Sequence, residues 1–378
     1  MDPSRISSQQ DFFEREGITF KKPERLWLHA LLFVSTFISC LIAGTAWIGK
    51  DALEVSNWHY GITYAILMMT FLSAHEFGHY FAARHHNVEA TLPFFIPMPL
   101  FFLMPFGTFG AVIKTRSHIP NRKVLFDIGV AGPIAGFIAC FVILIIGFIT
   151  LPGVEYLRGI HPNYPMPEPG QAGGIELFFG DTMLYNFLAS VFKNPQGFLP
   201  PPTEIYHYPF LCVGWFGLFV TSLNLLPFGQ LDGGHITYAM FGGKVQGIIA
   251  RVAWILMIII GLGFLYEKFY FDLQVDRPQM LYTALQSVIF PVLAFLKKIT
   301  PGLFTGWFGW LVWAGIAKFF VKLNHPPLED TQALGTKRML IGWLAIIIFI
   351  VSFCYSGIYT EEVAPSQNQQ GKAPIHQV

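Results

Sequence analysis

The sequence predicts an all-α polytopic membrane protein with about seven transmembrane helices and a short re-entrant or β-strand element between the second and the third. Composition is the first observation behind this fold class. Of the 378 residues, 53% are hydrophobic and only 12% are charged, whereas a soluble domain carries about 25% charge. The second observation is that the apolar residues form runs of membrane-spanning length. The third is that prolines break the apolar stretch that follows the second run.

The predicted transmembrane helices are the runs long enough to supply the roughly 20 apolar residues that cross a bilayer. They are Trp27–Ile48, Tyr60–Ala83, Val124–Leu151, His207–Phe228, Val245–Tyr266, Leu303–Val321 and Met339–Tyr359. A further apolar stretch, Met280–Leu296, is shorter and contains Pro291. We interpret it as an interfacial or re-entrant helix, because proline disrupts a regular helix interior.

Basic residues predict the orientation of these helices, because they accumulate in cytosolic loops. They precede the first run and lie between the second and third and between the sixth and seventh, whereas Pro152–Tyr206 is poorer in them. Residues 1–26 are polar and mixed in charge, which is not typical of a cleaved signal peptide. We therefore expect a cytosolic N-terminal segment at 1–26, a transmembrane domain at 27–359 with an external loop at 152–206, and a polar C-terminal tail at 360–378.

The proline-broken stretch Leu92–Phe109 cannot form a regular helix. It can enter the membrane only where protein or water covers its backbone. The overlapping residues 106–115 are β-branched and aromatic, with glycines that permit close backbone approach, as in a strand edge. Such an edge could hold an unwound peptide by strand addition. The alternative is that the segment only shields a site or turns the chain.

The most informative motif is His75-Glu76-Phe77-Gly78-His79, an H-E-x-x-H zinc-protease signature within the second run. The two histidines are one helical turn apart, so both imidazoles face a single ion. Glu76 lies beside them and can act as a general base toward a water at the metal. Ionisable groups are costly within a membrane helix, so they indicate a functional site. Chance occurrence is the alternative, and the apolar surroundings disfavour it.

A hydrolytic zinc site has three protein ligands and leaves a fourth position for water. The third ligand is predicted to be Asp232, because the fourth run enters from outside and brings this carboxylate to the cytosolic level of His75 and His79. Pro227 and the glycines around Asp232 weaken the helix there, which lets a carboxylate approach an ion. The alternative is that Asp232 only caps a helix that begins at Gly233 or Gly234.

Together, H-E-x-x-H and the later N-x-x-P-x-x-x-L-D-G-G motif of residues 224–234 resemble the site-2 proteases, which are intramembrane zinc metalloproteases. The resemblance is good over a catalytic core of about 60–235. It implies that His75, His79 and Asp232 bind zinc and that Glu76 is the catalytic base. It also implies that Asn224 positions the substrate backbone or stabilises the oxyanion. The segment with Gly107 and Gly110 resembles the strand-forming G-x-x-G region of the family, which implies substrate binding.

The resemblance implies a metalloendopeptidase with a zinc cofactor that cleaves transmembrane segments of membrane-tethered regulatory proteins. A PDZ or CBS domain is not expected, because the largest loop has about 55 residues and a PDZ domain needs about 90. The expected partners are a transmembrane protein substrate and the lipid bilayer. A net charge of +1 gives no reason to invoke nucleic acid. We expect a bacterial inner membrane, with a plastid envelope or thylakoid membrane as the alternative.

Two other function classes compete with this interpretation. A catalytically silent scaffold would bind clients without cutting them and would have no need of the Glu76 base. A zinc transporter or channel would need a polar pathway, and the other runs lack ionisable residues at their centres. The four cysteines lack C-x-x-C spacing, so we interpret them as packing residues. Gly132 and Gly136 form a small-x-x-x-small face that predicts close helix packing.

Overall fold

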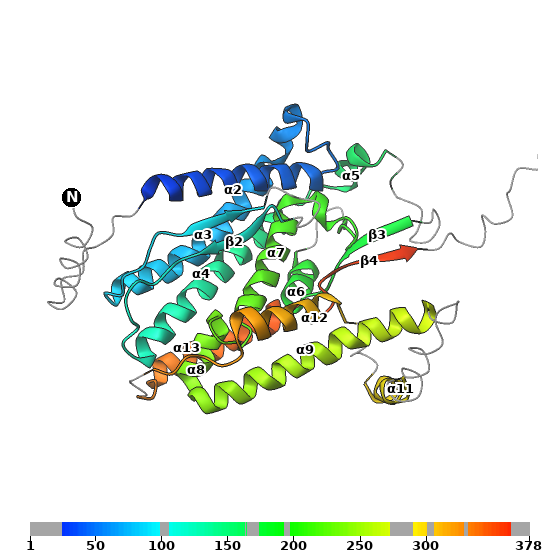
Figure 1. Ribbon diagram of the computed structural model, residues 1–378. Helices are drawn as coiled ribbons and strands as arrows, with labels where there is room; N and C mark the ends of the chain where they lie inside the picture. The colour runs from blue at the N-terminus through cyan, green and yellow to red at the C-terminus, as the bar shows by residue number, and fades with distance from the viewer. Residues whose placement is uncertain are drawn as a thin grey trace, which may run out of the picture.

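The computed structural model describes residues 25–98, 106–162, 164, 174–192, 197–272, 290–300, 306–328 and 332–363. The described chain is mainly helical, as predicted, and also contains two small antiparallel sheets (Figure 1). The longer helices are α2 (Leu26–Trp47), α3 (Ile62–His85), α4 (Arg122–Ile149), α7 (Pro209–Asn224), α9 (Gly243–Asp272) and α13 (Thr336–Ser352). The shorter ones are η1 (Val55–Gly61), α5 (Val154–Ile160), α6 (Met183–Val191), η2 (Ile205–His207), α8 (Asp232–Phe241), α11 (Phe290–Ile299), α12 (Gly309–Ile316) and η5 (Ala317–Val321).

Three of the described helices are long and apolar enough to cross a membrane, namely α2, α4 and the Gly243–Phe264 part of α9. Helix α3 has 24 residues, but the polar side chains of the H-E-x-x-H motif lower its mean hydropathy. Helix α7 and the Gly309–Val321 helix are apolar but shorter. Length and composition therefore support three spans among the described residues, not the seven that the sequence predicted.

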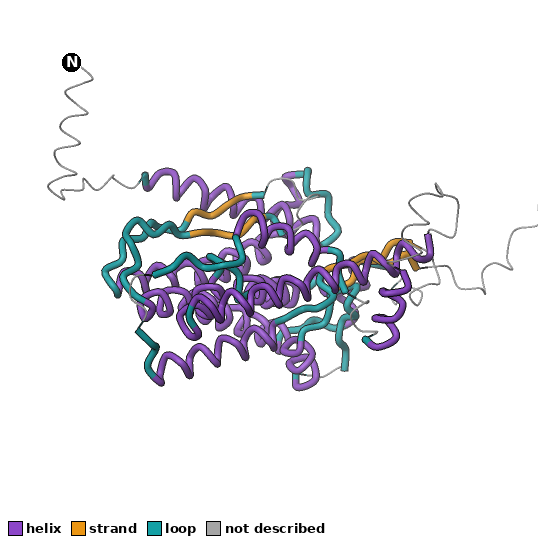
Figure 2. Tube along the Cα trace, turned by 60° about the horizontal axis from the view of Figure 1, so that its bottom comes forward, coloured by secondary structure: helices purple, strands orange, loops and turns teal. Residues whose placement is uncertain are grey.

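Strands β1 (Phe94–Pro97) and β2 (Thr108–Val112) pair antiparallel between α3 and α4, where the sequence predicted a strand element. Side chains from two helices hold this sheet in place. The Ser39 hydroxyl of α2 donates to the Met98 carbonyl over 2.5 Å, and the Tyr64 hydroxyl of α3 donates to the Phe106 carbonyl over 3.1 Å. Figure 2 shows the sheet lying alongside α2, well apart from the second sheet. Residues 99–105 of the proline-broken stretch lie outside the described residues.

The second sheet, β3 (Gly174–Phe179) with β4 (Ile358–Val363), was not predicted. The seventh predicted helix was expected to run to Tyr359, but it ends at Ser352. Gly357 then adopts a left-handed backbone with φ +57°, which turns the chain into β4. The Gly357 carbonyl accepts a hydrogen bond from the Gly180 amide over 2.8 Å, so the chain after α13 is joined to the predicted external loop.

Only the end of the predicted interfacial segment Met280–Leu296 is described, as the start of α11. Pro291 lies in the first turn of that helix, where the missing amide hydrogen costs no intrahelical bond. Residues 280–289 lie outside the described residues.

The helices bring the predicted cytosolic segments together at one end of the molecule. Asp127 near the start of α4 binds the guanidinium of Arg338 from α13 over 2.7 and 2.8 Å and contacts His86, which follows α3, at 2.8 Å. We call this the basic end. At the other end, the ring of Trp47 at the end of α2 contacts Phe179 of β3 and Tyr206 of η2. We call this the loop end.

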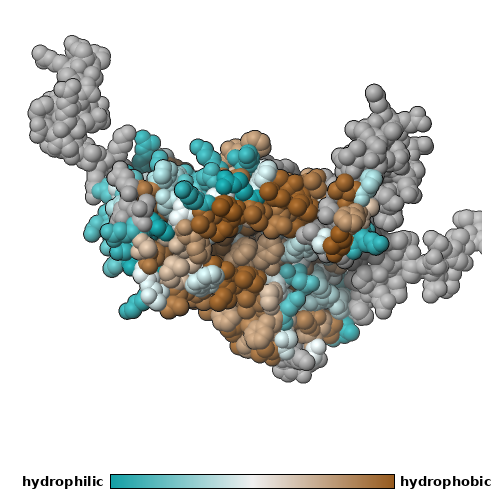
Figure 3. Space-filling view, turned by 90° about the horizontal axis from the view of Figure 1, so that it is seen from below, coloured by the Kyte–Doolittle hydropathy of each residue, from teal (hydrophilic) through white to brown (hydrophobic). Residues whose placement is uncertain are grey.

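The outer surface is strongly apolar. Figure 3 shows hydrophobic side chains spread across the middle of the face seen from below, with hydrophilic ones toward its margins. The described side chains of α9, at 243–264, include six large apolar ones that are exposed, namely Val245, Ile248, Val252, Ile255, Leu256 and Leu262. Continuous apolar patches of this kind are rare on soluble monomers and fit a hydrocarbon environment.

Candidate active site

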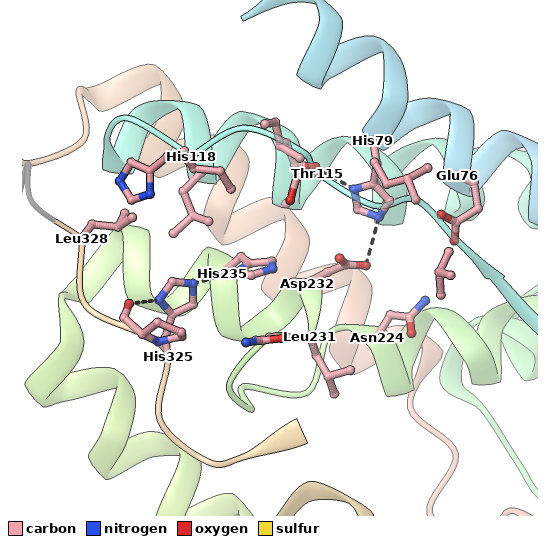
Figure 4. A pocket seen from close by; sticks show the side chains of 18 of the residues that line it. Glu76, His79, Thr115, His118, Asn224, Leu231, Asp232, His235, His325 and Leu328 are labelled. Carbon is pink, nitrogen blue, oxygen red and sulfur yellow. Dashed lines mark hydrogen bonds and ion pairs between the residues drawn. The ribbon is translucent and has the colours of Figure 1, made fainter. Parts of the chain in front are cut away.

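The predicted metal ligands meet between α3 and α8. His75 and His79 lie one turn apart on α3, and their Nε2 atoms are 3.1 Å apart. The Oδ2 atom of Asp232, at the start of α8, lies 3.3 Å from each of these nitrogens. All three residues are largely shielded from solvent. The structure thus brings Asp232 to two histidines that precede it by about 150 residues in the sequence, so the three predicted ligands lie together (Figure 4).

This triangle has the dimensions of a zinc site. A tetrahedral zinc ion with bonds of about 2.1 Å separates its ligand atoms by about 3.4 Å. The observed edges of 3.1, 3.3 and 3.3 Å are close to that value. Two imidazole nitrogens and one carboxylate oxygen are also a donor set that zinc accepts in catalytic sites, with a fourth position left open. The residues present therefore fit the ion.

Helix α4 fixes the orientation of the His79 ring. His79 Nδ1 donates a hydrogen bond of 2.7 Å to the Ile128 carbonyl, which turns Nε2 toward Asp232. Gly132 makes room for this ring, because a Cβ at that position would stand 2.0 Å from His79 Nε2. Gly136 faces the His75 ring more loosely, with its Cβ position 3.1 Å from His75 Nδ1. The small-residue face that predicted helix packing is thus the surface on which both ligands rest.

Asp232 does not serve as a helix cap. The N-cap of α8 is Leu231, and no side-chain capping bond forms there. The Asp232 carboxylate instead faces the two imidazoles, at the helix N-terminus, where negative charge is favoured. The next residue must be small, because a Cβ on Gly233 would stand 2.0 Å from the Leu225 carbonyl. The capping alternative is therefore wrong.

Glu76 is buried beside the ligands, with 6% of its surface exposed. The backbone of Ile113, just after β2, hydrogen-bonds to its carboxyl group. Asn224 ends α7 with its Nδ2 atom 3.3 Å from His75 Nε2. Figure 4 shows the side chains of Glu76, Asn224 and Asp232 directed into one space. This space belongs to a cavity of about 560 Å³ that is also lined by Ala111 and Val112 of β2.

Of the two predicted substrate-binding glycines, Gly107 lies just before β2 and Gly110 lies in the middle of the strand. Gly107 packs on α2, where a Cβ would stand 2.7 Å from the Cys40 Cα atom, and its φ is +76°. Gly110 has φ +98° and no neighbour within 4 Å of the Cβ position. Neither glycine is among the residues that line the cavity; Gly107 packs on α2, and Gly110 borders open space beside the strand.

A histidine pair in the same cavity was not predicted as part of the site. His235 Nδ1 lies 2.8 Å from His325 Nε2, and His325 Nδ1 donates to the Pro326 carbonyl. Burial lowers the pKa of His325, so this imidazole is neutral at pH 7. Since its Nδ1 carries the hydrogen, its Nε2 must accept one from His235. The signals in the sequence are the position of His235, three residues after Asp232, and the His325-Pro326-Pro327 segment after the sixth apolar run.

Comparison with known proteins places this geometry in a family. The sequence pattern of peptidase family M50 matches residues 63–265, which include every ligand above. The chain is 30% identical over 194 residues to "Probable zinc metalloprotease EGY2, chloroplastic" of Oryza sativa subsp. indica, covering 51% of this chain and 32% of the relative. It is 32% identical over 183 residues to "Probable zinc metalloprotease EGY1, chloroplastic" of Oryza sativa subsp. japonica, covering 48% and 28%.

A third relative, "Probable zinc metallopeptidase EGY3, chloroplastic" of Arabidopsis thaliana, is 28% identical over 206 residues, with 52% of this chain and 32% of the relative covered. The chain thus spans about a third of the length of the curated relatives it matches. No solved structure matches it. The family pattern covers more than half of the chain and all of its ligand residues, so the chain belongs to peptidase family M50, the site-2 protease family that its two motifs resemble.

Proposed function

We propose that this protein is a zinc-dependent intramembrane endopeptidase that cleaves transmembrane segments of membrane-tethered regulatory proteins. The observation that carries the proposal is the triangle of His75, His79 and Asp232 beside the buried Glu76 carboxyl group. The relatives described as zinc metalloproteases support it. Since the similarity covers about a third of their length, the activity of this chain rests on its own site.

In this proposal His75, His79 and Asp232 hold the ion. Zinc in such a site supplies a Lewis acid that activates water and polarises a carbonyl group. Glu76 accepts the proton of the attacking water at its carboxylate and passes it to the leaving amine. Asn224 donates from Nδ2 to the oxygen of the scissile carbonyl, because its amide reaches the same space as the ligands. His79 keeps its ligand nitrogen available through the bond to Ile128.

The setting of the site supports this substrate class. Helix α3, which carries two of the proposed ligands, exposes the apolar side chains of Ile62, Ile66 and Phe81, which supports a substrate drawn from a membrane segment. A helical segment hides its peptide groups in its own hydrogen bonds and must unwind before cleavage. Strand β2 borders the cavity at Ala111 and Val112 and offers backbone groups for pairing with the unwound chain. Gly110 leaves open space where that chain would lie.

We place the protein in a membrane as a multi-pass protein, with a lipid bilayer and a transmembrane substrate as its partners. The bacterial inner membrane of the sequence analysis remains a prediction. The relatives carry the word chloroplastic in their names, which supports the plastid alternative. Localisation of the tagged chain in its native cell, by fractionation of membranes, decides between the two.

The decisive experiment is cleavage of a model transmembrane substrate by the purified protein in detergent. Wild type should cut it, and a zinc chelator should stop the reaction. Glu76→Gln should lower the rate by about 10²–10⁴-fold while zinc content stays unchanged, because glutamine has nearly the same shape but cannot accept the proton. A scaffold would bind the substrate with no cleavage in any of these samples. Cleavage by Glu76→Gln within a few-fold of wild type would refute the assigned base.

A further inference from the structure

A second cluster of ligand-type side chains lies at the loop end, formed by His161, Glu204 and His207. His161 follows α5, Glu204 precedes η2, and His207 is the last residue of η2, just before α7. Helix α7 rises about 1.5 Å per residue, so His207 lies about 25 Å along the chain from Asn224 at the active site. The cluster is therefore separate from the ligands on α3 and α8.

The geometry of this cluster repeats that of the active site. The Nε2 atoms of His161 and His207 lie 3.0 Å apart. Glu204 Oε2 lies 3.3 Å from His207 Nε2 and 3.5 Å from His161 Nε2. These edges again match the roughly 3.4 Å between ligands of a tetrahedral zinc ion. A single N–H can point toward only one acceptor, whereas a cation at the centre attracts all three atoms.

Local structure holds the three side chains in this arrangement. Glu204 and His207 are three residues apart on a 3₁₀ turn, closed by a 3.1 Å bond from the His207 amide to the Glu204 carbonyl. Side chains at this spacing eclipse on a 3₁₀ helix, so both point to one side. The Tyr156 hydroxyl of α5 donates to the His207 carbonyl over 2.7 Å, which ties α5 to η2. The cluster is thus a feature of the fold and not of a single loop.

Burial distinguishes the cluster from a chance surface grouping. His207 is 2% exposed and Glu204 is 8% exposed. The side chain of His161 is 30% exposed, so the cluster opens to solvent at this histidine. This open side gives an ion a path of entry.

We propose that His161, Glu204 and His207 form a second zinc site, at the loop end of the molecule. Two imidazole nitrogens and one carboxylate oxygen suit zinc, and a fourth position remains for water. The ion would join the end of α5 to the start of α7 and so hold the predicted external loop against the helices. This site does not depend on the proposed proteolytic activity, because it uses none of the catalytic residues.

Zinc content per chain tests the proposal with four purified proteins: wild type, His75→Gln/His79→Gln, His161→Gln/Glu204→Gln and the combination of both pairs. Zinc is measured after dialysis in zinc-containing buffer and removal of free metal. Wild type should contain two equivalents, each of the two pair variants one, and the combined variant none. The His75→Gln/His79→Gln protein should also show a higher thermal unfolding midpoint with added zinc than with added magnesium.

The second site would be overturned if wild type held one equivalent that His161→Gln/Glu204→Gln retained and His75→Gln/His79→Gln lost; the catalytic site would then stand. If that single equivalent were instead retained by His75→Gln/His79→Gln and lost by His161→Gln/Glu204→Gln, the second site would stand and the catalytic zinc site would be refuted. Because Glu204 is buried, the single variant His161→Gln provides a milder test with lower risk of misfolding. It should reduce zinc content by one equivalent while its unfolding midpoint without metal stays near that of wild type, and retention of both equivalents would overturn the proposal.

Discussion

Gly132 of α4 lies directly against the imidazole of His79, so that a Cβ atom on this glycine would stand 2.0 Å from the ligand nitrogen. No side chain can share that space with the ring, and the bond from His79 to the Ile128 carbonyl prevents the ring from turning aside. The packing of α3 on α4 therefore fixes the position of His79 in the proposed metal site.

Gly132→Ala should consequently displace His79 and weaken zinc binding by at least about 10–100-fold, the range seen when a ligand loses its orientation. A loss of zinc binding would be informative, because replacing glycine by alanine within a helix ordinarily stabilises the helix by about 1 kcal/mol. Zinc content and cleavage rate measure the effect. Gly315→Ala in α12 is the matched control, since nothing lies within 4 Å of its Cβ position. Equal zinc content in both variants would contradict the assigned role of Gly132.

Asp232→Ala should remove one equivalent of zinc from the purified protein. The carboxylate supplies one of three ligand atoms, and the two imidazoles alone would hold the ion far more weakly. Metal analysis and the cleavage assay give the two readouts. Glu155→Ala, on a carboxylate whose side chain is 76% exposed, is the control and should change neither. Full zinc retention by Asp232→Ala would show that the third ligand lies elsewhere.

Arg122→Met should destabilise the protein by about 1–3 kcal/mol, because it leaves a buried carbonyl group without its partner. The Arg122 guanidinium donates from Nε over 3.0 Å and from a terminal nitrogen over 2.5 Å to the Ala239 carbonyl, near the end of α8. It therefore ties the helix that carries Asp232 to α4. The thermal unfolding midpoint should fall for Arg122→Met, and much less for Lys123→Met, which removes a neighbouring surface charge. Equal midpoints would mean that the bond contributes little.

The ligands could be predicted from the sequence because their chemistry is local. The H-E-x-x-H spacing fixes two imidazoles on one helical face, and a carboxylate among helix-breaking residues was the natural third ligand. The structure places His75, His79 and Asp232 together as expected. Asn224 also lies at the site. The strand at Thr108–Val112 followed from its β-branched and glycine residues.

What the sequence did not predict depends on contacts between distant segments. The β3–β4 pairing joins residues nearly 200 positions apart, and the apolar run before Tyr359 gave no sign that the helix would stop at Ser352. Gly107 looked like part of a substrate-binding edge, but its small size serves packing on α2. The contact between Gly132 and His79 could not be predicted for the same reason. The spacing of Gly132 and Gly136 indicates that another helix packs closely there, but not which residue lies against them.

The predicted orientation can be tested by labelling with a membrane-impermeant thiol reagent. The four native cysteines are buried, so an added exposed cysteine should dominate the signal. Ser190 of α6, in the predicted external loop, and Ser117, between α3 and α4, are both exposed. Ser190→Cys should react in intact cells and Ser117→Cys only after permeabilisation, because basic residues favour the cytosolic side. The reverse pattern would invert the protein and move its active site to the other face of the membrane.

The last prediction concerns backbone pairing between β2 and an unwound substrate. Ala111 and Val112 line the cavity, the backbone of Ile113 bonds to Glu76, and 50% of the Val112 surface is exposed. Strand addition uses main-chain hydrogen bonds, so Val112→Pro should remove a donor and distort the pairing. Cleavage of a helical membrane substrate should fall about tenfold, the loss from one hydrogen bond worth roughly 1.4 kcal/mol.

Two comparisons distinguish loss of this backbone pairing from a general loss of structure. Val112→Thr keeps the β-branched shape and the backbone donor, so its cleavage rate should stay near that of wild type. A short flexible peptide needs less unwinding and should be cleaved by Val112→Pro with a smaller loss than the helical substrate. Zinc content should be equal in all three proteins, because β2 supplies no ligand. If Val112→Pro cleaves the helical substrate as fast as wild type does, then β2 only shields the metal site, which was the alternative interpretation of this strand.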